Sequence, residues 1–503
     1  MTCLTEYSPP GRWQCARRLG AVAPQVIHCY GRERDALTSE ALDRVGSVRC
    51  LEPDAQGHPG YSTDRSLEEF FGFAAAFAHG ERVTMGATIT RRSLLSGAAT
   101  AVGAAAADVR RAQARAAVQP VPGSPPGALV THVSVPFGAS GLMGRSKQGQ
   151  AYLEQVIRGA IVPPLSQVVI YAHGWLTSAS DLMVIYDTLS QGFETQLRTL
   201  SRPQAGAAAG VPTAPPLAVP ATSVVFTTHW PSRRSDREGP IDLADVVSFA
   251  QMEARANLVG ETGMARLIGL LWELLLADPL AETRMLLISH SFGGRVLASA
   301  LHALPARIPD TFTALQTRNR INLVMLQPAM PADALEPTDL THAHPFGQLV
   351  HYQNLRILTT MSQWDTPLVR FYPAQEAQQP ADAVYATAPA ETRQAVPALG
   401  GAGPSDATWR AFNGALPRTD VAVGPGFEYA DVLGKAGQRL VVADLSPLHA
   451  AHRREDLTRP AGELPPFGRP DRRSMALSGY HNDIYSKEMY QLVIGFAWGQ
   501  QGL

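Results

Sequence analysis

The sequence predicts an α/β fold, in which a mostly parallel sheet carries helices on both faces. Short apolar runs rich in Val, Ile and Leu alternate along the chain with longer segments of helical period. The best-defined run, 167–172, is β-branched and uninterrupted, as expected for a strand buried on both faces. The chain has 503 residues, of which 45% are hydrophobic, which is enough to build a sizeable core.

Each element follows from a local pattern. Strands are expected at the apolar, β-branched runs, which are 128–135, 167–172, 223–228, 284–289, 321–326, 355–360 and 439–443. Helical periodicity is found between these runs or after the last one, over 182–197, 242–277, 295–304 and 486–498. Because strands and helices alternate, the strands are expected to pair in parallel.

One apolar run, 267–276, lies inside the second of these helices. Glu273 interrupts the run, and the run is shorter than the roughly 20 residues that a membrane-spanning helix needs. We therefore interpret it as a buried core helix and expect no transmembrane segment in the mature chain.

Composition excludes several classes of function. The formal net charge is -1, and no block of basic residues alternates with aromatic ones, so nucleic acid is not an expected partner. All four cysteines lie in the first 50 residues, at Cys3, Cys15, Cys29 and Cys50. The later part of the chain therefore has no disulfide, no thiolate metal site and no cysteine nucleophile.

The N-terminal region has the pattern of an export signal in an unusual place. Thr90–Leu95 (TRRSLL) is followed by a weakly apolar run and by alanines, so 85–107 resembles a bacterial twin-arginine signal peptide. Met85 gives such a signal a normal start, and residues 1–84 are then interpreted as a non-native or disordered extension. The mature chain is expected to begin near Asp108, which N-terminal sequencing of the native protein tests.

The mature chain is expected to form one domain. Residues 108–127 are rich in Ala, Arg and Pro and predict a linker, after which 128–503 forms the domain. Within it, 202–221 and 373–420 are rich in Ala and Pro and are expected to be a surface loop and an insertion. The insertion is expected either to cover the candidate site or to lie on the surface.

The strongest local signal is a sharp strand-to-helix turn, Ser289–Gly294 (SHSFGG). It follows the strand 284–289 and precedes a helix, which is the context in which a nucleophile elbow presents a serine hydroxyl above the sheet. Ser291 is the expected nucleophile, because the positions two before and two after it are the small residues Ser289 and Gly293. The amide of Phe292 begins the helix and is expected to supply half of an oxyanion hole.

A second signal lies at the end of the strand 167–172. His173-Gly174-Trp175 follows this strand, and the glycine allows a turn that points a backbone N–H at the developing oxyanion. The amide of Trp175 is the expected second donor. Fixed donors of this kind lower the barrier of acyl transfer by about 3–4 kcal/mol each.

A serine nucleophile needs a histidine base, and His481 is the expected one. It lies in Gly479–Tyr485 (GYHNDIY), a loop just before the final helix. His449 and His452 also follow the acid candidates, but their spacing is interpreted as an exposed helical turn.

The acid that orients the histidine is expected just beyond a strand end. Asp365 follows the strand 355–360 and is the favoured candidate. Asp444, which follows 439–443, stays an alternative. Aspartates beyond strands also serve commonly as turn or cap residues.

Together these residues resemble the α/β-hydrolase superfamily, within a branch of poorly characterised bacterial serine hydrolases. The resemblance covers about 128–498 and is carried by His173–Trp175, Thr228–Ser232, Ser289–Gly294, Ser362–Asp365 and Tyr480-His481. It implies an eight-stranded, mostly parallel sheet and an acyl-enzyme intermediate, with no metal and no organic cofactor. Ser289 departs mildly from this family's pattern, which commonly has glycine there.

The leading functional hypothesis is a serine hydrolase of carboxylic esters, with a small-molecule or lipid ester as substrate. Trp175 and Phe292, with Trp364 or Trp230, are candidates for an apolar acyl pocket, although such aromatics more often belong to the core. Amide or peptide hydrolysis by the same triad stays open, as does a catalytically silent binding module. The signal implies the twin-arginine export machinery as a partner and a periplasmic or extracellular location.

Overall fold

The computed structural model describes most of the chain from residue 129 onward and three short segments before it. The described residues are 3–8, 12–17, 28–29, 129–161, 167–201, 222–233, 248–276, 284–309, 312–313, 320–338, 344–376, 397–433, 435, 437–460, 463–470 and 475–498. The chain divides into two compact units, Met1–Ser93 and Leu94–Leu503. The predicted signal peptide and linker, 85–127, lie outside the described residues, as does the predicted loop 202–221.

The first unit contains a small sheet. Its strands are β1 (Cys3–Ser8), β2 (Arg12–Arg17) and β3 (His28–Cys29). They are arranged in the order β2-β1-β3, with β2 antiparallel and β3 parallel to β1.

The second unit is built on an eight-stranded sheet in which every pairing is parallel. The strands are β4 (Leu129–Pro136), β5 (Gln167–Ala172), β6 (Thr222–His229), β7 (Arg284–His290), β8 (Ile321–Leu326), β9 (Leu355–Met361), β10 (Val421–Ala422) and β11 (Leu440–Asp444). They are arranged in the order β10-β11-β9-β8-β7-β5-β6-β4. Because all strands run the same way, their carboxyl ends lie along one edge of the sheet.

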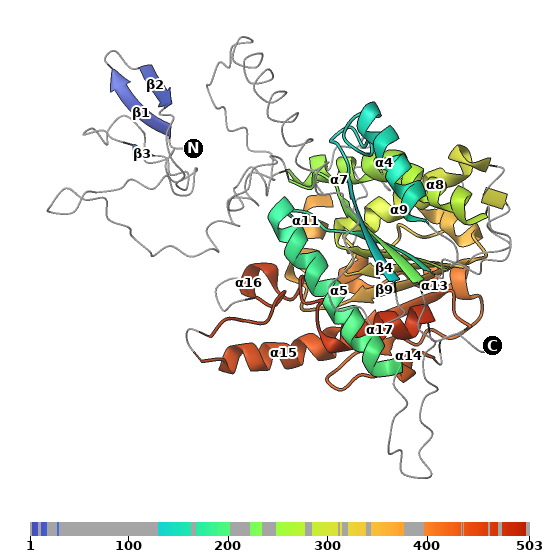
Figure 1. The fold of residues 1–503 in the computed structure, drawn as a ribbon. Coiled ribbons are helices and arrows are strands. Elements are labelled where there is room, and N and C mark those ends of the chain that lie inside the picture. Colours follow the sequence, from blue (N-terminus) through green and yellow to red (C-terminus); the bar gives the residue numbers. More distant parts are fainter. Residues whose placement is uncertain are drawn as a thin grey trace. The chain divides into compact units, whose positions relative to one another are not determined.

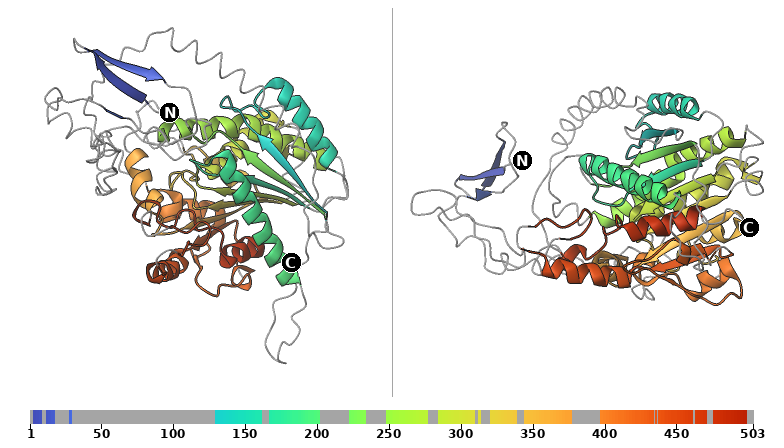
Figure 2. Two further views of the ribbon diagram at one scale, coloured as in Figure 1. Left: turned by 60° about the vertical axis from the view of Figure 1, so that its left-hand side comes forward. Right: turned by 60° about the horizontal axis from the view of Figure 1, so that its bottom comes forward.

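Helices cover both faces of this sheet (Figures 1 and 2). The described helices are α4 (Lys147–Ala160), α5 (Ala179–Ser201), α7 (Phe249–Val259), α8 (Ala265–Leu276), α9 (Phe292–Arg307), α11 (Tyr372–Glu376), α12 (Leu399–Ala402), α13 (Asp406–Asn413), α14 (Ala430–Leu433), α15 (Ser446–Thr458), α16 (Met475–Ser478) and α17 (Lys487–Trp498). Buried side chains of α4, α7, α8, α9, α12 and α13 form one core, and those of α5, α14, α15 and α17 form the other. The predicted α/β fold with helices on both faces is confirmed.

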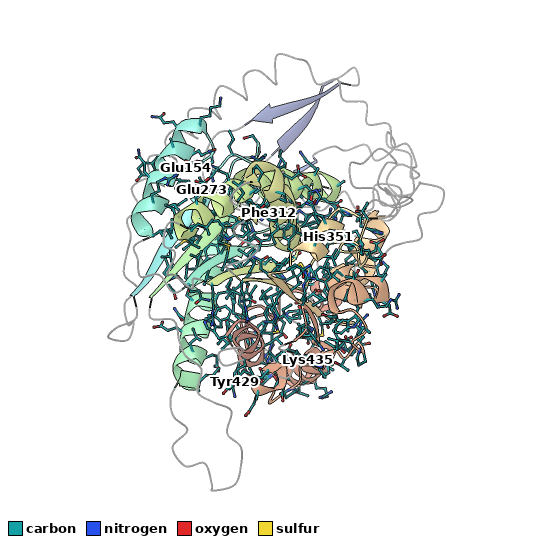
Figure 3. All side chains as sticks on the ribbon, turned by 90° about the vertical axis from the view of Figure 1, so that its right-hand side faces the viewer. Glu154, Glu273, Phe312, His351, Tyr429 and Lys435 are labelled. Atoms are coloured by element: carbon teal, nitrogen blue, oxygen red, sulfur yellow. The ribbon has the colours of Figure 1, made fainter. Side chains whose placement is uncertain are left out.

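Alternation along the strands explains the two cores. In β7, Met285 and Leu287 belong to one core, and Leu286 and Ile288 belong to the other, because successive strand side chains point to opposite faces. Figure 3 shows side chains packed on both sides of the sheet, with Phe312 labelled on one side and Tyr429 on the other. Burial on both faces is why these strands are apolar without interruption.

Three features differ from what the sequence predicts. The eighth strand, β10, has 2 residues and gave no sequence signal of its own. The helix expected over 242–277 consists of α7 and α8 joined by a π-helical turn at Gly260–Met264. In the second part of the predicted insertion, 397–420, Leu399, Trp409 and Phe412 are core residues rather than parts of a loose loop.

The predicted core helix 267–276 forms the greater part of α8. Eight of its twelve positions are buried, among them Trp272 and Leu271. A helix that spans a bilayer must be both long and apolar, and none of the described helices meets both conditions.

Candidate active site

The strand order brings the candidate residues to a topological switch point. β5 and β7 are neighbours, but the chain leaves β5 toward β6 on one side and leaves β7 toward β8 on the other. Such a divergence opens a crevice at the carboxyl ends of the two strands, where parallel α/β proteins bind ligands. His173–Trp175 follows β5 and Ser291 follows β7, so both lie at this switch point.

Backbone strain is concentrated at the same edge. Four non-glycine residues in the described part of the chain have positive φ, and three of them follow adjacent strands: Leu176 (φ 61°), Ser291 (φ 55°) and Gln327 (φ 44°). Such conformations cost about 1–3 kcal/mol each and persist where the surroundings impose them, commonly at functional sites. The pattern therefore marks the ends of β5, β7 and β8 as one candidate site.

The turn at Ser291 has the geometry predicted for an elbow. Ser291 has φ 55° and ψ -126° and directly precedes α9. A Cβ on Gly293 would lie 2.1 Å from the carbonyl oxygen of Ala172, so only glycine fits there. The Ser289 hydroxyl donates to the Val324 carbonyl oxygen at 3.0 Å, so this small polar residue is satisfied inside the sheet.

Gly174 allows the loop after β5 to approach the elbow. A Cβ on Gly174 would lie 2.8 Å from the Cβ of Ser291 and 3.3 Å from the His290 carbonyl oxygen. The peptide between Gly174 and Trp175 is therefore adjacent to the candidate nucleophile, as the sequence predicts.

The orientation of this peptide is set by two side chains. The Gly174 carbonyl oxygen accepts hydrogen bonds from His173 Nδ1 at 2.8 Å and from the Thr177 hydroxyl at 3.1 Å. In a trans peptide the N–H points opposite to the carbonyl, so the Trp175 N–H points away from these two side chains. Burial lowers the pKa of His173 to about 3, and its Nε2 accepts from the Trp230 amide at 3.2 Å, which leaves Nδ1 as the donor.

Asp365 and His481 are brought together although they are 116 residues apart in the chain. His481 Nδ1 lies 2.8 Å from Asp365 Oδ2, and the Asp365 carboxylate is fully buried. Because Nδ1–H donates to the carboxylate, Nε2 keeps a lone pair and is available as a base. Asp365 Oδ1 also accepts from the Leu368 amide at 3.0 Å, which fixes the carboxylate plane.

Among the hydrogen bonds of the described residues, none joins the Ser291 hydroxyl to the His481 ring. The two loops are instead linked through His290, whose Nε2 donates to the His481 carbonyl oxygen at 2.8 Å. The rings of His290 and His481 lie 4.7 Å apart between centroids. Catalytic hydrogen bonds are often long in proteins without substrate and tighten when substrate binds.

The alternative acid, Asp444, has a different role. Its Oδ1 accepts at 2.8 Å from the amide of Ser446, the first residue of α15. The carboxylate bonded to His481 is that of Asp365.

The other two histidine candidates are buried, so the prediction that they lie on an exposed helical turn is wrong. His449 and His452 are 0% and 5% exposed on α15. They bond to Ser362 and Asp483, and therefore face the protein interior. The sequence pattern predicted exposure because the helix face that carries these histidines is polar, although the structure buries it.

Sequence reasoning missed Gln327, which holds the candidate acid. Its Nε2 donates to Asp365 Oδ2 at 2.8 Å and to the Tyr480 carbonyl oxygen at 3.2 Å. Gln327 is fully buried and directly follows β8. The sequence did contain a signal for Gln327, since it is a polar residue at the carboxyl end of a buried strand.

The four aromatic residues considered for an acyl pocket are placed differently. Trp175 is partly exposed, and its ring contacts Phe292 and Phe249 edge-on. Trp230 is fully buried and stacks on His173, and the Trp364 ring is covered by Arg453. Phe292 is 1% exposed and belongs to the core, which leaves Trp175 as the candidate beside the elbow.

In the described part of the chain, no group of three or more His, Cys, Asp or Glu side chains could hold a metal ion.

Comparisons with known proteins add little. No protein-family model matches the sequence, and no curated protein matches it. Among solved structures, the chain is similar to phospholipase PlaB from Legionella pneumophila, solved in complex with thio-NAD, with 16% sequence identity and a TM-score of 0.21. The match covers 41% of this chain and 39% of that one. A likeness at this level leaves the function to be argued from the residues of this chain.

Proposed function

We propose that this protein is a serine hydrolase that cleaves carboxylic esters through an acyl-enzyme intermediate. The observation that carries the proposal is the 2.8 Å contact between His481 and the buried Asp365 at the sheet edge where Ser291 occupies a strained elbow. A serine, an aspartate and a histidine in this chain order are the groups that acyl transfer at a nucleophile elbow needs.

In the first half of the proposed reaction, Ser291 Oγ attacks the ester carbonyl carbon. His481 Nε2 takes the hydroxyl proton, and the Asp365 carboxylate stabilises the imidazolium that results. When the tetrahedral intermediate collapses, the bond to the alcohol oxygen breaks, and His481 returns the proton to the leaving alcohol. The acyl group stays on Ser291 as an ester.

In the second half, water replaces the alcohol. His481 takes a proton from water, the resulting hydroxide attacks the acyl carbon, and the carboxylic acid leaves as Ser291 recovers its proton. The amides of Trp175 and Phe292 are the proposed donors to the oxyanion in both halves. The contacts of the Gly174 carbonyl with His173 and Thr177 support this role, because they fix the peptide that carries the Trp175 N–H.

The first test is covalent labelling by a fluorophosphonate, which reacts with activated serines. The protein should be labelled at one site, the Ser291→Ala variant should lose the label, and turnover of p-nitrophenyl esters should fall by at least about 10³-fold. Ser134→Ala is the matched control, because Ser134 is exposed on β4 and takes no part in the site. Labelling and turnover that persist in Ser291→Ala would disprove the assignment.

Substrate class is tested by a graded panel. The kcat/KM values of esters of increasing acyl length should exceed those of the corresponding anilides, with Trp175 lining the acyl site. Preferred cleavage of the anilides would instead identify an amidase, and binding without turnover would identify a silent module.

Export is part of the proposal and is supported by the sequence alone. Residues 85–107 carry the twin-arginine pattern, so we place the active protein in the periplasm or outside the cell.

A further inference from the structure

Helix α15 buries a polar face against the candidate site. His449, His452 and Asp456 are spaced three and four residues apart, so they share one side of the helix, and they are 0%, 5% and 1% exposed. Burying imidazoles and a carboxylate is costly unless each finds a partner. Partners of all three side chains are found in two loops, the acid loop 361–365 and the histidine loop 479–484, and Asp456 also pairs with Arg459 and Arg469.

The first turns of α15 hold the acid loop. The Leu445 amide donates to the Met361 carbonyl oxygen at 2.8 Å, and the Gln363 amide donates to the Ser446 hydroxyl at 3.1 Å. One turn later, His449 Nδ1 lies 2.8 Å from Ser362 Oγ. These contacts fix the loop immediately before Asp365.

The same helix holds the histidine loop on both sides of His481. Before it, the Tyr480 hydroxyl donates to Asp456 Oδ2 at 3.0 Å. After it, His452 Nδ1 lies 2.5 Å from Asp483 Oδ2. Residues on both sides of the candidate base, Tyr480 and Asp483, are therefore bonded to α15.

His449 contacts both loops at once. Its Nε2 lies 3.4 Å from the Asp483 carbonyl oxygen, which only accepts, so Nε2 is the donor and Nδ1 accepts from the Ser362 hydroxyl. Ser362 Oγ in turn accepts from the Trp364 amide at 3.1 Å. Burial lowers the pKa of His449, in agreement with the neutral ring that this chain of donors requires. Its ring also stacks on Tyr480, with centroids 5.5 Å apart.

We infer that α15 is a clamp that sets the position of His481 relative to Asp365, and that His449 is its central positioning residue. The inference rests on the proposed function for its catalytic consequence. Asp365 and His481 belong to loops far apart in the chain, and a displacement of 1 Å in a catalytic group lowers the rate by about 10²-fold. A buried polar network is seldom the most stabilising way to fill such an interface, but its directional contacts fix geometry.

Substitutions of His449 separate its two contacts. In His449→Asn, the side-chain amide lies near the position of Nδ1 and keeps the bond to Ser362. In His449→Gln, the amide lies near the position of Nε2 and keeps the bond to Asp483. His449→Leu keeps neither hydrogen bond. We expect kcat for ester cleavage to fall by about 100-fold in His449→Leu and by about 10-fold in each amide variant, with KM changed less than about twofold. His302→Leu is the matched control, because His302 lies on α9, about 16 Å along the helix from its start beside Ser291.

A crystal structure of His449→Leu gives a readout that does not depend on activity. We expect the 2.8 Å contact between His481 Nδ1 and Asp365 Oδ2 to be lost while the sheet is unchanged. If His449→Leu keeps this contact and loses no more kcat than His302→Leu, the clamp is disproved and the assignment of Ser291 still stands. If the unmodified protein is neither labelled at Ser291 nor active on esters, the proposed function fails, and the crystal structure alone decides whether α15 positions the pair.

Discussion

At the scale of single residues, the candidate site depends on backbone conformations that are costly elsewhere. Ser291 has a positive φ because the chain must turn from β7 into α9 within one residue, and Gln327 has one directly after β8. Gly293 meets a different requirement at the same turn, because it lies against the end of β5 and leaves no room for a side chain. Each position has a geometric requirement that stands independently of the proposed chemistry.

Gly293→Ala should destabilise the fold strongly. The new Cβ would lie 2.1 Å from the Ala172 carbonyl oxygen, and the nearest atoms all belong to the backbone of Ala172 and His173, which cannot easily move. We expect the free energy of unfolding in urea to fall by about 3 kcal/mol or more. Gly159→Ala is the control: nothing lies within 4 Å of its Cβ position in α4, so stability should rise by about 0.5–1 kcal/mol. Equal effects of the two substitutions on the free energy of unfolding would contradict the requirement for glycine at position 293.

At the scale of elements, the loop between β5 and α5 presents one peptide N–H to the elbow. The loop is short, and its direction is fixed by contacts of His173 and Thr177 with a single carbonyl oxygen. The loop is also tied to the end of β6, because the Thr177 amide donates to Ser232 Oγ at 3.2 Å. A rigid donor is what oxyanion stabilisation needs, since a donor that must reorganise during reaction gives less benefit.

Thr177→Val should lower kcat for ester cleavage about 3- to 10-fold and leave KM unchanged. Valine keeps the shape of threonine but lacks the hydroxyl that holds the Gly174 carbonyl, a hydrogen bond that contributes about 1 kcal/mol. Steady-state kinetics on a p-nitrophenyl ester measures the effect. Thr188→Val is the control, because Thr188 is half-buried on α5, away from the elbow, and its hydroxyl donates only to the Val184 carbonyl of its own helix. A rise in KM with an unchanged kcat would show that the loop binds substrate and does not stabilise the transition state.

At the scale of the whole molecule, the site makes folding sensitive to acid. His173 and His290 are buried in neutral form beside the elbow, and burial lowers the pKa of each to about 3, from 6.5 for a solvated imidazole. Between about pH 3 and pH 6.5 the unfolded chain therefore binds more protons at these two positions than the folded chain does. Stability must rise with pH through this window and fall on acidification.

His290→Gln should make the free energy of unfolding less dependent on pH between 4.5 and 7. Removing one such histidine lowers the slope of the unfolding free energy against pH by up to about 1.4 kcal/mol per pH unit. Gln keeps an N–H donor for the His481 carbonyl oxygen. Urea unfolding at a series of pH values measures the slope. His351→Gln is the control, because His351 is exposed. A slope as steep in His290→Gln as in the unmodified protein would show that His290 is not held neutral.

Much of the architecture can be predicted from local sequence patterns. The bounds of β5 and β8 agree with the apolar runs that predict them, because strands buried on both faces have little freedom in composition. The elbow was predictable for a similar reason, since small residues around Ser291 are required by the turn itself. The prediction of Asp365 over Asp444 is supported by contact geometry and awaits a functional test.

What the sequence alone determined is therefore the α/β class, most strand positions and the candidate serine and histidine, with Asp365 favoured over Asp444 as the acid. Only the tertiary structure decided that β10 completes the sheet, that His449 and His452 face inward, and that Gln327 bonds to Asp365. The physical reason is the range of the interactions. A strand or a turn is specified by neighbouring residues, whereas a polar contact such as that of Asp365 with His481, 116 residues apart, arises only when a parallel sheet brings its strand ends to one edge.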